Sequence, residues 1–456
     1  MFEKLVATFF LVVVGCGYAA AQDAVGASTE ELDRWVSAYT DAAGPGLSVL
    51  VQRGDEKLLY EGYGLASIEH GVAATPETVY RIGSITKQFT GAAVAMLAEQ
   101  GKLSIDDPIT KFLPDYPTHG HVITVRHLLH HTSGIKSYTG VPGWVEEKIQ
   151  LDLTTSELVD AFKSYPMDFG PGERFLYNNS GYVLLGAIIE DVSEMSYAEF
   201  IEQNISEPLG LANTRYEDRS IVPNMARGYT SEGGTILRAR YLSVTQPHAA
   251  GMLTSTVDEL AKWTVALASG SVVSAESYQQ MITPTLLNDG TEYPYGFGLR
   301  INDVRGRVAI AHAGGIHGGQ SYGLHIPDEN VIVVLLTNND AFKPMLEYIG
   351  VNLAAMAIGD PYHEPVPVTL NRAERNGLAG TFANASYGDL EIWFDGADAK
   401  ARAVFGEWDL QPVSVTEFAV QDSFWRVEVA TDSDGQRTTN LYTDATSPPM
   451  IFTEKE

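Results

Sequence analysis

Ser84 and Lys87 stand three residues apart where an irregular stretch of the chain passes into a strongly helical one. Apolar residues continue downstream at helical spacing with no intervening proline: Phe89, Ala92, Ala93, Met96 and Leu97. The spacing predicts Ser84 at or near a helix N-terminus, with Lys87 one turn later on the same face. A base beside a hydroxyl makes it a useful nucleophile, and the N–H groups of a helix N-terminus stabilise an oxyanion. Taken alone, the spacing fits an N-capping serine and a solvated lysine better.

Two further polar motifs lie at the edges of predicted elements. The first is Tyr177 with Asn179, which follows a Gly-Pro-Gly turn and precedes a helical run over residues 180–192. The second begins at His312, which ends a predicted apolar strand over residues 308–311 and opens a glycine-rich stretch. Along the chain the order is S-x-x-K, Y-x-N and H-x-G.

In this order the three motifs resemble those of the penicillin-recognising serine hydrolases. That family includes class C β-lactamases, D,D-peptidases, D-aminopeptidases and related esterases, and its class A members carry the sister set S-x-x-K, S-D-N and K-T-G. The resemblance covers roughly residues 28–360 and includes Tyr80–Gly83, residues 123–134 and Tyr295–Gly298. It implies a serine hydrolase that works through an acyl-enzyme.

The resemblance also implies a role for each motif residue. Ser84 is the expected nucleophile, and Lys87 and Tyr177 are the expected proton-transfer pair, either of which can be the base. Asn179 is expected to orient Lys87 and the substrate amide. His312, Gly314 and Gly315 complete the expected substrate-binding wall, and the backbone N–H groups of Ser84 and Gly315 form the expected oxyanion hole.

His312 departs from the β-lactamase pattern, which has a lysine at this place. A histidine with a pKa near 6.5 is mostly neutral at pH 7 and is a weak partner for a substrate carboxylate. The residue therefore favours esters, or amides and peptides of D-amino acids. Two alternatives stay open: a β-lactamase or D,D-carboxypeptidase on the same scaffold, and a catalytically idle relative that binds peptidoglycan fragments.

Predicted strands at both ends of the first 360 residues, with helices between them, indicate an α+β fold. One antiparallel sheet would be built from both ends, with an inserted helical lobe, as in β-lactamases and transpeptidases. The active site is expected where sheet and lobe meet. The predicted elements are a helix over residues 29–42, strands over 47–52, 57–63, 297–302, 308–311, 321–326 and 331–337, and a helix over 344–357.

The chain of 456 residues is too long for one typical core. We expect a β-lactamase-like hydrolase domain over residues 22–360, a proline-rich linker over 361–372 and a small all-β domain over 373–456. The last is predicted as a barrel or sandwich similar to the lipocalin-like domains of some D-aminopeptidase relatives. Its expected role is structural or substrate-gating rather than independent binding.

Residues 1–21 read as a signal peptide: one lysine, an apolar run too short to span a membrane, and Ala19-Ala20-Ala21 before the cleavage point. We therefore expect an exported protein, periplasmic or secreted, whose mature chain has no transmembrane segment. The alternative is a lipoprotein with a lipid anchor at Cys16, the one cysteine of the chain.

Charge and histidine placement bear on partners and cofactors. The formal net charge of −28, with no basic patch, argues against nucleic acid. His127, His130 and His131 are interpreted as structural because no carboxylate or cysteine pattern completes a metal site, and we expect neither a metal nor a cofactor. His317 is expected on a surface loop, with contact to the substrate as the alternative. The expected partner is a small-molecule or peptide substrate, with an origin in the cell wall as one option.

Overall fold

A computed structural model describes residues 26–218, 220–363, 365–385, 387–404, 406–443 and 449–455. The predicted signal peptide and Cys16 lie outside these residues. Within them, no helix is both long and apolar enough to cross a membrane.

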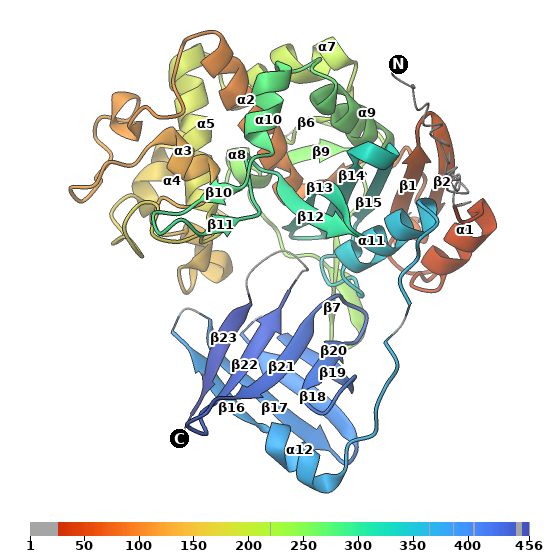
Figure 1. The fold of residues 1–456 in the computed structure, drawn as a ribbon. Helices are drawn as coiled ribbons and strands as arrows, with labels where there is room; N and C mark the ends of the chain where they lie inside the picture. The colour runs from red at the N-terminus through yellow and green to blue at the C-terminus, as the bar shows by residue number, and fades with distance from the viewer. Residues whose placement is uncertain are drawn as a thin grey trace, which may run out of the picture.

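One antiparallel sheet of six strands forms the centre of the first domain (Figure 1). Its order is β12-β13-β14-β15-β1-β2, so β15 from the end of the domain pairs with β1 from its beginning, as predicted. The strands are β1 (Leu47–Arg53), β2 (Glu56–Tyr63), β12 (Arg300–Val304), β13 (Arg307–Ile316), β14 (Gly319–Ile326) and β15 (Val331–Thr337).

Both faces of the sheet are covered, which explains why β15 is apolar along its length. Val333 and Leu335 point into a core shared with α1 (Thr29–Ser37) and α11 (Leu346–Ala357). Val334 and Leu336 point to the opposite face and join the larger core of the helical lobe. Successive strand side chains alternate between faces, so a strand buried on both sides needs no polar residues.

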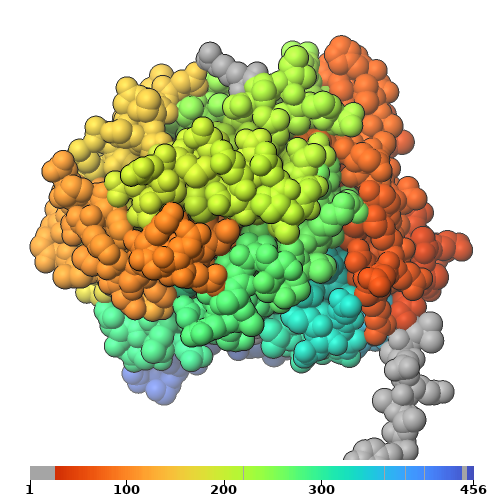
Figure 2. All heavy atoms as spheres, turned by 90° about the horizontal axis from the view of Figure 1, so that it is seen from above, coloured from red at the N-terminus to blue at the C-terminus, as the bar shows by residue number. Residues whose placement is uncertain are grey.

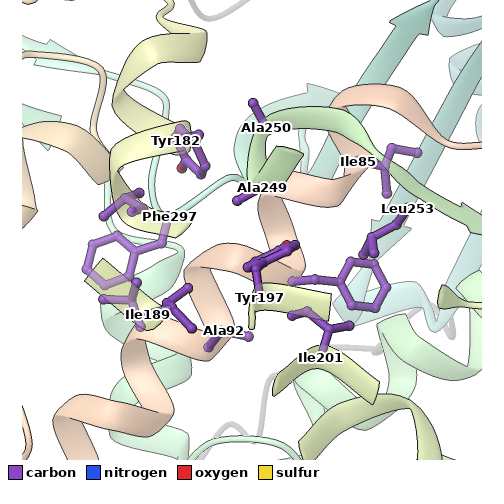
Figure 3. Close-up of a cluster of buried hydrophobic side chains, with 14 of the residues drawn as sticks. Ile85, Ala92, Tyr182, Ile189, Tyr197, Ile201, Ala249, Ala250, Leu253 and Phe297 are labelled. Atoms are coloured by element: carbon purple, nitrogen blue, oxygen red, sulfur yellow. The ribbon is translucent and has the colours of Figure 1, made fainter. Parts of the chain in front are cut away.

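The helical lobe is inserted between β2 and β12 and packs around the long helix α2 (Thr86–Glu99) (Figure 1). Figure 3 shows part of the core at the start of α2, where Ile85, Ala249, Ala250 and Leu253 gather. The other helices of the lobe are α3 (Val125–Leu129), α4 (Thr155–Phe162), α5 (Asn179–Ser193), α6 (Tyr197–Ile201), α7 (Glu207–Leu209), α8 (His248–Gly251), α9 (Val257–Ala268) and α10 (Ala275–Met281).

Short strands pair around this lobe outside the main sheet. They are β3 (Leu65–Ser67), β4 (Val72–Ala73), β5 (Tyr80–Arg81), β6 (Arg215–Tyr216), β7 (Tyr229–Glu232), β8 (Thr235–Arg238), β9 (Leu253–Ser255), β10 (Thr285–Leu286) and β11 (Glu292–Tyr293). The β7–β8 hairpin extends from the first domain toward the second (Figure 1).

The C-terminal domain is a closed barrel whose interior is filled by apolar side chains such as Phe382, Phe418 and Phe452. It hangs below the first domain in Figure 1 and is almost hidden when the molecule is seen from above (Figure 2). Its strands are β16 (Gly380–Asn384), β17 (Gly388–Asp395), β18 (Asp398–Ala403), β19 (Gly406–Pro412), β20 (Glu417–Val420), β21 (Arg426–Thr431), β22 (Arg437–Tyr442) and β23 (Met450–Glu454).

The α+β fold and the all-β C-terminal domain are confirmed, whereas several boundaries were wrong. The first helix ends at Ser37 rather than near residue 42. A short helix, α12 (Arg372–Leu378), precedes the barrel where linker and strand were expected. β13 does not stop before His312 but continues through Gly314 and Gly315 to Ile316, and the turn comes at Gly318, with φ of 79°.

Candidate active site

Ser84 lies in the single turn of 3-10 helix (Gly83–Ile85) that leads directly into α2. Hydrogen bonds hold this turn from two sides. The Ser321 hydroxyl of β14 donates to the Ile82 carbonyl at 2.7 Å, and the Leu253 N–H donates to the Thr86 hydroxyl at 3.1 Å. The nucleophile predicted from the sequence is thus fixed between the sheet and the lobe.

Lys87 is fully buried, and no carboxylate is among its hydrogen-bond partners. Its Nζ lies 3.1 Å from Ser84 Oγ, 2.9 Å from Asn179 Oδ1 and 2.7 Å from the carbonyl oxygen of Ala250. Burial without a counter-ion lowers the pKa of Lys87 well below its ordinary value. Since the amide and carbonyl oxygens only accept, a neutral amine donates to both and turns its lone pair toward the Ser84 hydroxyl.

Tyr177 is placed beside this pair. Lys87 Nζ lies 4.8 Å from the centroid of the Tyr177 ring. The Tyr177 hydroxyl is buried and has no hydrogen-bond partner among the described residues. Burial raises the pKa of Tyr177, and the nearby Ser84 hydroxyl lowers it by a smaller amount. The phenol is therefore protonated at neutral pH.

Asn179 sits at the beginning of α5, where the side chain of Asn178 caps the helix by accepting from Gly181 N–H at 2.9 Å. With the cap supplied by Asn178, the Asn179 side chain faces the site. It accepts from Lys87 and donates from Nδ2 to the Thr139 hydroxyl at 3.0 Å. The structure thus brings Ser84, Lys87, Tyr177 and Asn179 together.

His312 is buried in β13, and both of its ring nitrogens have protein partners. Nε2 lies 3.0 Å from the Tyr295 hydroxyl, and Nδ1 lies 2.5 Å from the carbonyl oxygen of Ala313. Burial, together with the charge of Arg300, lowers the pKa of His312 well below its ordinary value. A neutral, fully engaged imidazole is poorly placed to bind a substrate carboxylate.

The Tyr295 hydroxyl also lies 3.1 Å from Nε2 of His131. The Asn178 N–H donates to His131 Nδ1 at 3.1 Å, so His131 carries its proton on Nε2 and donates it to Tyr295. Tyr295 then donates to His312, which must hold its own proton on Nδ1 toward Ala313. Sequence reasoning treated His131 as structural and gave Tyr295 no role, yet both orient His312.

Gly314 of β13 lies against the 3-10 turn that carries Ser84. A Cβ at this position would lie 2.2 Å from the Ile82 carbonyl oxygen and 3.1 Å from Ser84 N, so only glycine allows the approach. At Gly315 a Cβ would meet no atom within 4 Å, and this residue borders open space beside Ser84.

Two cavities open beside Ser84. One, of about 640 Å³, is lined by Tyr177, His312 and Arg300. The other, of about 140 Å³, is lined by Asn179 and Thr139. His317 lies in the loop between β13 and β14, as expected, and this loop lines both cavities.

Arg300, which sequence reasoning missed, brings a cation into the larger cavity. It lies in β12 opposite Ala311, one residue from His312. It forms none of the ion pairs found among the described residues. Burial lowers the pKa of Arg300, but the charge of Glu347 and the nearby tyrosines raise it overall. A clue was present in the sequence, since the residue follows the family-like Tyr295–Gly298 segment. Within the described part of the chain, no three His, Cys, Asp or Glu side chains group as metal ligands.

The chain is similar to known proteins over most of its length. The sequence profile of the family named Beta-lactamase matches residues 32–355, most of the chain. Penicillin-binding protein 4* of Bacillus subtilis (strain 168) is 27% identical over 437 residues, which cover 89% of this chain and 95% of the relative. D-aminopeptidase of Gluconobacter oxydans (strain 621H) is 29% identical over 353 residues, 76% of this chain but only 64% of the relative.

Among solved structures, the octameric penicillin-binding protein homologue from Pyrococcus abyssi superposes with a TM-score of 0.67 at 27% sequence identity. The match covers 94% of this chain and 100% of that protein, so it includes the C-terminal domain. With the profile match extending over both ends of the central sheet and the lobe between them, the chain belongs to the β-lactamase family of hydrolases.

Proposed function

We propose that this protein is an exported serine hydrolase that forms an acyl-enzyme at Ser84 and cleaves amides or peptides of D-amino acids, or small esters. The observation that carries the proposal is the 3.1 Å contact between Ser84 Oγ and the buried, counter-ion-free amine of Lys87. The likeness to a D-aminopeptidase supports the substrate class.

We assign Lys87 as the base because its pKa and that of Tyr177 are shifted in opposite directions. Lys87, with its lowered pKa, takes the proton of Ser84 as Oγ bonds to the substrate carbonyl carbon. Tyr177, with its raised pKa, stays protonated and gives its proton to the leaving nitrogen or oxygen as that bond breaks. Lys87 then returns a proton to Tyr177, and water releases the acyl group from Ser84 by the reverse sequence. The backbone N–H groups of Ser84 and Gly315 are assigned to the oxyanion.

A second function, D,D-carboxypeptidase or β-lactamase activity, is favoured by one observation. Arg300 provides the cationic group that the neutral His312 does not. A guanidinium in a half-buried cavity binds a carboxylate well, since it offers two parallel N–H donors. Substrates with a free carboxylate near the scissile bond therefore remain candidates.

A panel of substrates tests these functions on the full-length mature protein. It contains nitrophenyl esters, D-alanyl and L-alanyl nitroanilides, a peptide ending in D-alanyl-D-alanine, and a fluorescent penicillin. We expect turnover of esters and D-alanyl nitroanilide and, by intact-mass spectrometry, an acyl adduct that the Ser84→Ala variant lacks.

The outcomes separate the candidate functions. An adduct that persists in Ser84→Ala would reject the nucleophile assignment. Turnover confined to the penicillin or to the D-alanyl-D-alanine peptide would replace the first function by the second. Inertness toward the whole panel would leave a binding protein.

A further inference from the structure

A groove leads from the candidate active site to the C-terminal barrel. The 640 Å³ cavity beside Ser84 shares Met345 and Glu347 with a neighbouring cavity of about 290 Å³. That cavity shares Tyr348, Tyr362 and the barrel residue Trp425 with an interdomain cavity of about 810 Å³. The three cavities therefore follow one another from the nucleophile to the barrel wall.

The barrel is held against the first domain by aromatic packing. Phe424, in the loop between β20 and β21, lies 5.1 Å from the ring of Tyr348 and 4.9 Å from that of Tyr362. Phe424 thus joins the core that α11 forms with the sheet. Aromatic contacts of this kind are worth more than their area alone.

The β12–β13 hairpin carries residues of the candidate site and also holds the segment that packs against Phe424. Arg305, in the turn between β12 and β13, donates to Asp360 at 2.6 Å and to the Tyr362 hydroxyl at 3.2 Å through its backbone N–H. β12 and β13 carry Arg300 and His312. The barrel wall therefore has a defined position relative to the catalytic cavity.

The proposed role of Tyr177 as the acid places the leaving group of a substrate in the larger cavity, where the groove begins. The leaving atom must be protonated, and the protonated Tyr177 lines only the larger of the two cavities beside Ser84. A leaving group that Tyr177 protonates would lie in that cavity, which continues toward Met345 and Glu347.

We infer that this groove binds the leaving-group portion of a peptide substrate, with the barrel residues Phe424 and Trp425 forming its distal wall. The inference rests on the proposed function and deepens it: the preferred substrates are peptides that continue several residues beyond the scissile bond. Aromatic walls suit peptide planes and aliphatic side chains. Binding energy from such remote contacts raises the specificity constant.

Two amide-capped peptides test the inference, since a cap removes any carboxylate that Arg300 would bind. They are D-alanyl-L-alanine amide and D-alanyl-tetra-L-alanine amide. We expect the full-length protein to favour the longer peptide about tenfold or more in kcat/KM. In Trp425→Ala, and in Met345→Trp, which narrows the junction of the cavities, the ratio of the two constants should fall toward one.

Matched variants separate this effect from general damage. Val415→Ala removes an exposed barrel side chain that lines none of these cavities, and Met345→Leu keeps the junction open, so both should keep the wild-type ratio. Equal constants for both peptides in the wild type, or ratios that the groove variants do not change, would overturn the inference while leaving Ser84 acylation intact.

A binding measurement keeps the inference testable if no peptide is turned over. Calorimetry on Ser84→Ala should show tighter binding of the longer peptide, and this difference should be lost on adding Trp425→Ala. Equal binding of both peptides would overturn the inference. So would a concentration-dependent oligomer that Met345→Trp dissociates and that shows no length preference, because the groove would then be a contact between copies of the chain.

Discussion

Tyr295 joins two buried histidines, with its hydroxyl 3.1 Å from Nε2 of His131 and 3.0 Å from Nε2 of His312. The Asn178 N–H fixes the tautomer of His131. The directions of the hydrogen bonds from His131 to Tyr295 and from Tyr295 to His312 follow from it. His312 is kept neutral and its ring is held, so its part in the site is to shape the wall of the cavity.

Tyr295→Phe should weaken this arrangement without changing the volume of the side chain. It leaves a donor on His131 and an acceptor on His312 without partners, so we expect the free energy of unfolding to fall by about 1–3 kcal/mol. The pKa of His312 should rise toward its ordinary value because the Tyr295 donor stabilises the neutral ring. Histidine NMR titration and urea unfolding measure the two effects.

Tyr116→Phe is the matched control, since Tyr116 is also buried but lines neither cavity beside Ser84. This variant should leave the pKa of His312 unchanged. A His312 pKa that stays the same in Tyr295→Phe would contradict the hydrogen-bond direction given above.

Lys87→Met should abolish most acylation, with a loss of about 10²–10⁴-fold in kcat/KM for a nitrophenyl ester. In the unchanged protein, kcat/KM should fall with decreasing pH as Lys87 is protonated, with an apparent pKa below the usual value of about 10.4 for lysine. A pH–rate profile from pH 5 to 10 checks this. A flat profile would contradict Lys87 as the base.

The same lysine makes stability depend on pH. Its folded-state pKa is lowered, so below the unfolded pKa the unfolded chain binds a proton that the folded chain lacks, and folding is penalised. The penalty shrinks as pH rises toward the unfolded value. We therefore expect the difference in Tm, Lys87→Met minus wild type, to be larger at pH 6 than at pH 9. The reverse order would show that Lys87 is buried as an ammonium ion.

The sequence alone predicts the fold and the motif residues whose spacing is regular. Ser84, Lys87, Tyr177 and Asn179 were predicted because their motifs stand at or just before the beginning of a helix and follow one another in the order of the family. The predicted strand over residues 308–311 is shorter than β13 because the glycines that follow it were interpreted as a turn. Gly314 continues the strand because it pairs with Ser321 of β14, and it is a glycine because it approaches Ile82 closely, which no local pattern encodes.

Arg300 and Tyr295 could not be assigned from the sequence for a related reason. The position of Arg300 in the site depends on the pairing between β12 and β13, and that of Tyr295 on hydrogen bonds to residues far away in the chain. Periodicity reports which face of an element is buried, but not which polar groups meet there. His312 was therefore weighed as an isolated imidazole, without its buried partners.

Arg300→Gln should affect substrates according to their charge. For a peptide ending in D-alanyl-D-alanine we expect kcat/KM to fall about 10–100-fold, because a half-buried guanidinium–carboxylate contact is lost. For the same peptide with an amide cap the change should be below about threefold, because no carboxylate contacts the arginine. The ratio of the two specificity constants is the measurement. Equal losses for both peptides would show that Arg300 supports the fold rather than the substrate.

Gly314→Ala and Gly315→Ala form a matched pair that tests the approach of β13 to the nucleophile. At Gly314 the added methyl group would overlap the Ile82 carbonyl at 2.2 Å, so the strand or the Ser84 turn must move. Overpacking of this kind costs about 1–3 kcal/mol, and a displaced Ser84 should acylate at least tenfold more slowly. At Gly315 nothing lies within 4 Å, so the Tm should change little. Thermal unfolding and burst-phase acylation of both variants measure these effects. Equal Tm values would mean that β13 does not contact the Ser84 turn tightly at Gly314.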